Sequence, residues 1–247
     1  MSTIHCSFRS QTLGKSNPFI MVMPEEGTPY TLPGLEPRLV FGLHALSAGY
    51  EQLYAKTPIQ FFADTYNMTF VLPQADRSFY LNGVYPYEDY ITEELPDYLD
   101  RHFKLPDRSR WSVLGVSMGG YGAANLYAKH PDLFSSCASF SGAFDIPLMQ
   151  ELSKADPYRV GQESLDPILQ DSFDSLFDRT FPKNGKIALF CGKSDFLYPS
   201  NLRLAEKLEK EGVRAHIHFE EGDHDWIFWS SVFEEGLRFL QGVNPEK

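Results

Sequence analysis

Short apolar runs, rich in β-branched and aromatic residues, recur along the chain, and several contain almost no polar residue. Continuous runs of this kind are typical of parallel strands that helices cover on both faces. Seven such runs occur, at residues 18–23, 38–43, 68–72, 111–116, 134–140, 186–191 and 213–219. They predict the strands of one central sheet.

Stretches with apolar residues at helical spacing lie between several of these runs, at residues 93–103, 121–129, 201–210 and 226–240. Strands that alternate with helices predict an α/β fold, with a mostly parallel sheet, right-handed crossovers and helices on both faces.

Residues 145–185 break this alternation with mixed acids, prolines and short apolar clusters. We expect a small cap-like insertion there, over the C-terminal edge of the sheet where ligands bind in such folds. No repeat or low-complexity linker divides the sequence, so we predict that residues 1–247 form a single domain.

Composition limits the classes of partner. The chain has 247 residues, 43% of them hydrophobic, and a formal net charge of −11. Such a charge repels phosphate backbones and anionic lipid, so we expect neither nucleic acid nor a membrane surface as a partner. The N-terminal residues lack a basic stretch followed by an apolar one, and Cys6, Cys137 and Cys191 are too widely spaced for a disulfide framework. These features predict a cytoplasmic location.

The motif with the clearest chemistry is Gly115-Val-Ser117-Met-Gly119, between an apolar run and a predicted helix. A strand, a tight turn and a helix form the nucleophile elbow, in which small flanking residues let the backbone turn sharply and expose the serine. Ser117 also precedes a helix N-terminus, whose free N–H groups favour a developing oxyanion. The alternative is a serine that only caps an ordinary helix.

A serine hydroxyl needs a base to take its proton, and the base needs an acid to hold its tautomer. In the hydrolase order the histidine comes last, after the final strand. His224 lies between the run 213–219 and the last predicted helix, and Asp195 follows the preceding run. We therefore predict His224 as the base and Asp195 as its acid, with Asp145 as the second choice of acid.

Two further groups of residues bear on the chemistry. An oxyanion needs two N–H donors; we expect one from Met118, after the predicted nucleophile, and one from the loop 43–49.

His216 and His218 alternate within a predicted strand and should face one helix layer. Because no third or fourth ligand stands nearby at a helpful spacing, we predict no metal site.

Seven stretches along the chain match a known family in their order: residues 43–49, 78–80, 92–96, 115–122, 138–142, 192–195 and 222–224. Taken together, they resemble the esterase D family of α/β-hydrolases, particularly its tributyrin-esterase branch. The resemblance implies the α/β-hydrolase fold and the cleavage of carboxylic esters, and of some thioesters, without a metal or cofactor.

Carried over residue by residue, the resemblance implies Ser117 as nucleophile, His224 as general base, Asp195 as its orienting acid, and the N–H groups of Met118 and Leu46 as oxyanion donors. The family usually has His-Gly before the second donor, whereas this chain has His44-Ala45. An alanine in a conformation suited to glycine costs about 1 kcal/mol or forces a different loop path.

The sequence thus predicts a serine carboxylesterase that hydrolyses short-chain acyl esters of small molecules. An S-formylglutathione-type thioesterase and a carbohydrate acetyl or feruloyl esterase stand as alternatives. From another class, a catalytically silent binding protein is opposed by the presence of Ser117, Asp195 and His224 together, and Ala45 is its only support. The sequence leaves open the natural ester and whether the chain forms a homo-oligomer.

Overall fold

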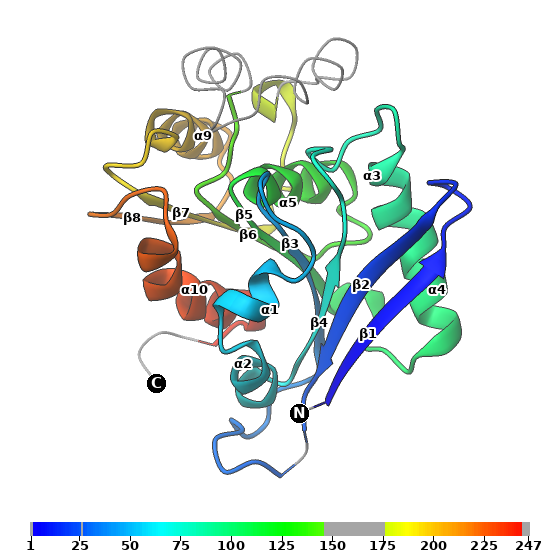
Figure 1. The fold of residues 1–247 in the computed structure, drawn as a ribbon. Helices are drawn as coiled ribbons and strands as arrows, with labels where there is room; N and C mark the ends of the chain where they lie inside the picture. The colour runs from blue at the N-terminus through cyan, green and yellow to red at the C-terminus, as the bar shows by residue number, and fades with distance from the viewer. Residues whose placement is uncertain (1, 26, 146–175, 244–247) are drawn as a thin grey trace.

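An eight-stranded sheet runs through the centre of the molecule in the computed structural model, which describes residues 2–25, 27–145 and 176–243 (Figure 1). The strands follow the spatial order β1-β2-β4-β3-β5-β6-β7-β8. Their bounds are β1 Ser2–Arg9, β2 Ser16–Met23, β3 Arg38–Leu43, β4 Met68–Pro73, β5 Trp111–Val116, β6 Ser136–Phe140, β7 Lys186–Gly192 and β8 Ala215–Glu220.

The sheet is mostly parallel. From β4 to β8 every pair of neighbouring strands is parallel, and only β1 with β2 and β2 with β4 are antiparallel. The seven expected strands are all present, with ends shifted by at most a few residues. Strand β1 was not expected; it lies at an edge of the sheet, and its side chains alternate between exposed and half-buried.

Helices cover both faces of the sheet (Figure 1). One layer holds α1 (Gln52–Lys56), α2 (Ile59–Tyr66) and α10 (Trp226–Gln241), and the other holds α4 (Leu95–His102), α5 (Met118–Lys129) and α9 (Tyr198–Lys210). A short α3 (Tyr87–Asp89) leads through a π-helical turn, Tyr90–Glu94, into α4. The four helices expected from the sequence are confirmed, whereas α1, α2 and α3 were missed.

Four parallel strands bring the expected site residues to one edge of the sheet. The six residues of β5 are all buried, as are those of β3, because helices pack on both of their faces. The segments that follow β3, β5, β7 and β8 leave the sheet at the same edge, since parallel strands share their carboxyl ends. The expected oxyanion loop, Ser117, Asp195 and His224 lie on these four segments.

Two expectations remain predictions. Most of the cap-like insertion falls on residues 146–175, which lie outside the described residues, and the assignment of the whole chain to one domain is also untested. Among the helices of the described segments, none has both the length and the apolar character that crossing a bilayer requires.

Candidate active site

Ser117 occupies the sharp turn between β5 and α5. Its backbone angles, φ 58° and ψ −114°, lie in a region that residues with a side chain rarely adopt. Hydrogen bonds fix this conformation: the Ser117 N–H donates to the Phe140 carbonyl (2.8 Å), and the Ser117 carbonyl accepts from the N–H groups of Tyr121 (3.0 Å) and Ala143 (3.2 Å). The turn has the geometry of the expected nucleophile elbow.

The two glycines of the motif are required by close backbone approach. A Cβ on Gly119 would lie 2.1 Å from the carbonyl oxygen of Leu43, at the end of β3, and a Cβ on Gly115 would lie 2.2 Å from the carbonyl oxygen of Gly119. A side chain at Gly119 would push the start of α5 away from β3, and one at Gly115 would push it away from β5. The contact also sets the distance between Ser117 and the loop expected to complete the oxyanion site.

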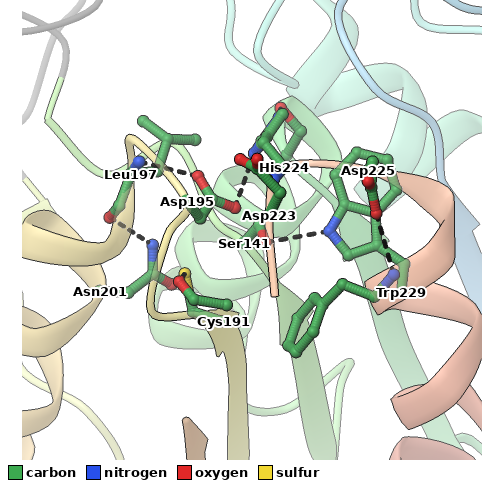
Figure 2. A network of polar contacts seen from close by, with 12 residues as sticks. Ser141, Cys191, Asp195, Leu197, Asn201, Asp223, His224, Asp225 and Trp229 are labelled. Carbon is green, nitrogen blue, oxygen red and sulfur yellow. Dashed lines mark hydrogen bonds and ion pairs between the residues drawn. The ribbon is translucent and has the colours of Figure 1, made fainter. Parts of the chain in front are cut away.

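The imidazole of His224 joins Ser117 to Asp195. Its Nε2 lies 3.1 Å from the Ser117 hydroxyl oxygen, and its Nδ1 lies 2.8 Å from one Asp195 carboxylate oxygen. The other Asp195 oxygen accepts a hydrogen bond from the Leu197 N–H at 2.8 Å, so that Leu197 and His224 flank the carboxylate (Figure 2). The structure therefore brings the three expected residues together, and the carboxylate that pairs with His224 belongs to Asp195 rather than Asp145.

Burial and capping hold the histidine loop in place. The Asp195 side chain is fully buried and that of His224 is only 14% exposed. The ring of His224 lies between those of Phe196 and Trp229, with centroid distances of 4.6 and 4.9 Å. Just after the histidine, Asp225 caps α10 through side-chain hydrogen bonds to two backbone N–H groups of its first turn. The loop thus enters the helix at a fixed angle.

Sequence reasoning missed two residues that support this arrangement. The indole N–H of Trp229 donates to the Ser141 hydroxyl at 2.9 Å (Figure 2), which anchors the ring that packs against His224. Ser141 adopts a left-handed backbone conformation, φ 48°, and its N–H donates to the Phe190 carbonyl on β7. The sequence signal for Ser141 was its position in the stretch 138–142, which carries the family resemblance, but the stretch indicated no role for this serine.

The loop after β3 adopts a conformation that alanine tolerates. Ala45 is not among the residues with positive φ, and its N–H donates to the Gln52 side chain at 2.8 Å. The loop therefore takes a path that does not require the glycine usual in the family. The expected cost of Ala45 in a glycine-type conformation does not arise.

His44 and Tyr80 hold the start of this loop. The Tyr80 hydroxyl donates to the His44 carbonyl at 2.9 Å, and both side chains are buried. His44 Nε2 accepts from the Ala75 N–H, which leaves Nδ1 to donate to the Ala45 carbonyl. Burial lowers the pKa of His44, so this imidazole is neutral and acts as a fixed support.

Two backbone donors at the site have no acceptor among the described residues. The Met118 N–H lies in the first turn of α5, where helix N–H groups lack intrahelical partners, and the Leu46 N–H belongs to the turn after Ala45. Both segments adjoin Ser117 through the contact of Gly119 with β3. A developing negative charge next to the Ser117 hydroxyl could therefore be met by either donor.

Of the residues that the structure describes, one set of side chains could share a metal ion. It comprises His216, His218 and Glu235, and it does not include Ser117, Asp195 or His224. The two histidines face α10, as expected. The sequence offers no third ligand at a helpful spacing, but in the fold α10 brings Glu235 to both rings.

Comparisons with known proteins show the family to which the chain belongs. A family model described as "Putative esterase" matches residues 81–240. An acetyl esterase of Caldicellulosiruptor saccharolyticus is 24% identical over 265 aligned residues, covering 99% of this chain and all of that protein.

Solved structures give the same result for the fold. FphF, a fluorophosphonate-binding serine hydrolase of Staphylococcus aureus, is similar with a TM-score of 0.79 and 24% identity, over 97% of this chain and 98% of that one. The S-formylglutathione hydrolase FrmB of Staphylococcus aureus has a TM-score of 0.75 and 23% identity, with the same coverage. The expected fold and family resemblance are confirmed. Since the family model spans more than half of the residues, the chain belongs to this esterase family and is a carboxylic ester hydrolase with the α/β-hydrolase fold.

Proposed function

We propose that the protein is a serine esterase that hydrolyses short-chain acyl esters through Ser117, His224 and Asp195. The observation that carries this proposal is the continuous hydrogen-bonded chain from the Ser117 hydroxyl through both nitrogens of His224 to a buried carboxylate. This is the arrangement that activates a serine, because the imidazole can take the hydroxyl proton while the carboxylate stabilises the imidazolium.

The first half of the reaction acylates the serine. His224 Nε2 takes the proton as the Ser117 oxygen bonds to the ester carbonyl carbon, and the carbonyl oxygen becomes an oxyanion. The Met118 and Leu46 N–H groups would donate to that oxyanion. When the tetrahedral adduct collapses, the ester C–O bond breaks and the alcohol leaves with the proton from Nε2.

The second half releases the acid. Water gives a proton to His224 Nε2 and attacks the acyl carbon, and the same two N–H groups would meet the second oxyanion. Collapse returns the proton to the Ser117 oxygen and frees the carboxylic acid. Asp195 keeps its charge throughout, since its role is to hold the Nδ1–H tautomer. The sequence expectation that no metal or cofactor takes part belongs to this proposal.

Support for a short acyl group comes from two sources. In the given sequence, the sheet, its helices and the segment 145–185 account for almost all residues, and little is left for a large lipase-like lid. The curated relative is named an acetyl esterase. A thioesterase of the S-formylglutathione type and a carbohydrate acetyl or feruloyl esterase use the same triad chemistry, and substrate profiling separates them.

Labelling with a fluorophosphonate, combined with hydrolysis of aryl esters, tests the proposal. Wild-type protein should be labelled at one serine, and Ser117→Ala should lose labelling and roughly 10⁶ in kcat while staying folded. Ser230→Ala, at an exposed position on α10, is the matched control and should behave as wild type. Hydrolysis by Ser117→Ala within tenfold of wild type would overturn the assignment, and a wild type that is not labelled would favour a silent binding protein.

A further inference from the structure

A cluster of two histidines and a glutamate lies on the outer edge of the sheet, away from the proposed triad. His216 and His218 occupy alternate positions of the edge strand β8, so their side chains point to the same face. Glu235 of α10 reaches both: one carboxylate oxygen lies 2.6 Å from His216 Nε2, and the other lies 2.8 Å from His218 Nδ1. Spacing along the chain could not reveal this, because Glu235 stands on a different element.

A second carboxylate lies beside the other ring nitrogen of His218. Glu220 lies 3.3 Å from Nε2, the ring nitrogen that faces away from Glu235. If Nε2 keeps its hydrogen for Glu220, the lone pair of Nδ1 in the neutral ring points at a lone pair of the Glu235 carboxylate. Two lone pairs at this distance repel unless a proton or a metal ion lies between them. In metal sites an outer carboxylate commonly orients a ligating histidine in this way.

We propose that His216, His218 and Glu235 form a zinc-binding site. The three ligand atoms lie within 4.8 Å of one another. Zinc binds histidine nitrogen and carboxylate oxygen at about 2.0–2.2 Å, so tetrahedral ligands stand about 3.3 Å apart. The carboxylate oxygens, at 2.6 and 2.8 Å from the two nitrogens, would move outward by about 0.5–0.7 Å, and the most widely spaced ligand atoms would move inward to the same separation. Because all three side chains are partly exposed, water can fill the fourth position.

The donor set selects the class of metal. Two imidazoles and one carboxylate suit zinc and other late first-row ions, whereas magnesium and calcium prefer oxygen ligands alone. Three basic residues, Lys186, Arg214 and Arg238, line a hollow of about 450 Å³ beside His216 and Glu235. Their positive charges weaken the binding of a cation that is held by electrostatic attraction alone. They weaken zinc binding less, because imidazole nitrogens bind zinc by donating lone pairs.

Bound zinc would join the two elements that flank the histidine loop. His216 and His218 lie on β8, before His224 in the chain, and Glu235 lies on α10, after it. Figure 1 labels both elements. An ion shared by the strand and the helix would tie the edge strand to the helix layer. The site is structural and stands apart from ester hydrolysis, so it does not depend on the proposed function.

Zinc titration of chelator-treated protein tests the site, with calorimetry for affinity and the melting temperature as a second readout. Wild type should bind one zinc ion and melt higher with zinc than without it, and magnesium should do neither. His216→Ala, His218→Ala and Glu235→Gln should each weaken binding by at least about tenfold, and Glu220→Gln by about 10–100-fold. Glu235→Gln keeps the size of the side chain, so it reports on ligation even if an alanine variant misfolds.

Two controls separate this cluster from other histidines. His102→Ala removes a ring that packs against Tyr98 on α4, outside the cluster, and it should bind zinc as wild type does. His224→Ala removes the imidazole of the proposed triad, which lies outside the cluster, and it should also keep full affinity. Absence of saturable zinc binding in wild type, unchanged binding in Glu235→Gln, or binding lost only in His224→Ala would each overturn the proposal.

Discussion

Gly192, at the end of β7, lies against the carbonyl oxygen of Gly222 in the histidine loop: a Cβ on Gly192 would stand 2.2 Å from that oxygen. The same oxygen accepts a hydrogen bond from the Ser194 N–H at 3.0 Å. The segment that carries Asp195 and the loop that carries His224 are therefore in direct backbone contact. Their separation, and with it the bond from Asp195 to His224, depends on a position without a side chain.

Gly192→Ala should separate these two segments. Overpacking of this kind costs about 1–3 kcal/mol, so the melting temperature should fall. The longer distance between Asp195 and His224 should also lower kcat more than it changes KM. Gly83→Ala, where a Cβ meets nothing within 4 Å, is the control for stability. Wild-type kcat and melting temperature in Gly192→Ala would show that the contact relaxes without cost.

Asp195→Asn should remove roughly 10⁴ from kcat, because an amide cannot hold the imidazole in the correct tautomer. Asp145→Asn should have little effect on the rate, since His224 bonds to the other aspartate. Steady-state kinetics on an aryl ester, with circular dichroism to verify folding, compares the two variants. A severe loss in Asp145→Asn together with a mild one in Asp195→Asn would reverse the assignment of the acid.

Stability should depend on pH through the cluster on β8. Burial alone lowers the pKa of His218, but hydrogen bonds to Glu235 and Glu220 outweigh it, and the pKa lies above its ordinary value of 6.5. For Glu235, burial raises the pKa, but bonds to the two histidines bring it below 4.5. The contribution of His218 to the free energy of unfolding is therefore complete below pH 6.5 and is lost as the pH rises through its raised pKa. The contribution of Glu235 is present above pH 4.5 and is lost as the pH falls through its lowered pKa.

The melting temperatures of wild type and His218→Gln, compared in chelator, measure this dependence. The difference should be largest between pH 4.5 and 6.5 and should shrink towards pH 8. His102→Gln, a substitution outside the cluster, is the control variant. Zinc should act in the opposite direction, stabilising wild type more as the pH rises, because protons compete for the histidine nitrogens. A difference in chelator that grows as the pH rises from 6.5 to 8 would contradict the ion-pair explanation.

Esters of short acids should be the better substrates. Each methylene that fits the acyl pocket gains up to about 0.8 kcal/mol, so kcat/KM should rise over the first few carbons and fall once the pocket is full. We expect acetyl to butyryl aryl esters to exceed octanoyl esters. S-formylglutathione and feruloylated sugars, assayed beside them, distinguish the alternative esterases. Rates that continue to rise through dodecanoyl esters, measured below their micelle concentrations, would contradict the prediction.

The strands that the sequence predicted are those whose composition reflects burial on both faces. The parallel strands β3 and β5 are apolar almost throughout, so their runs stand out from the surrounding residues. Strand β1 has one half-buried face and polar residues on the other, and such a pattern at an edge resembles a loop. Helices α1 and α2 have only five and eight residues, against sixteen in α10, so the helical period has few positions in which to show.

The order of motifs along the chain predicted which residues meet at the site, because parallel strands bring their carboxyl ends to one edge. It could not predict contacts that depend on helix rotation, such as Trp229 on Ser141 or Glu235 on the two histidines. These pairs are set by how α10 packs on the sheet. The spacing of these residues along the chain reveals nothing of that rotation.

The backbone of Ser117 has a consequence for how this protein can change. Its angles are ones that glycine adopts freely and serine does not, at a cost of about 1–3 kcal/mol. Glycine at position 117 would release that energy and would also remove the hydroxyl. Selection for thermal stability alone therefore acts against the residue proposed to do the chemistry, and a lineage that no longer needed the enzyme would gain stability by losing its serine.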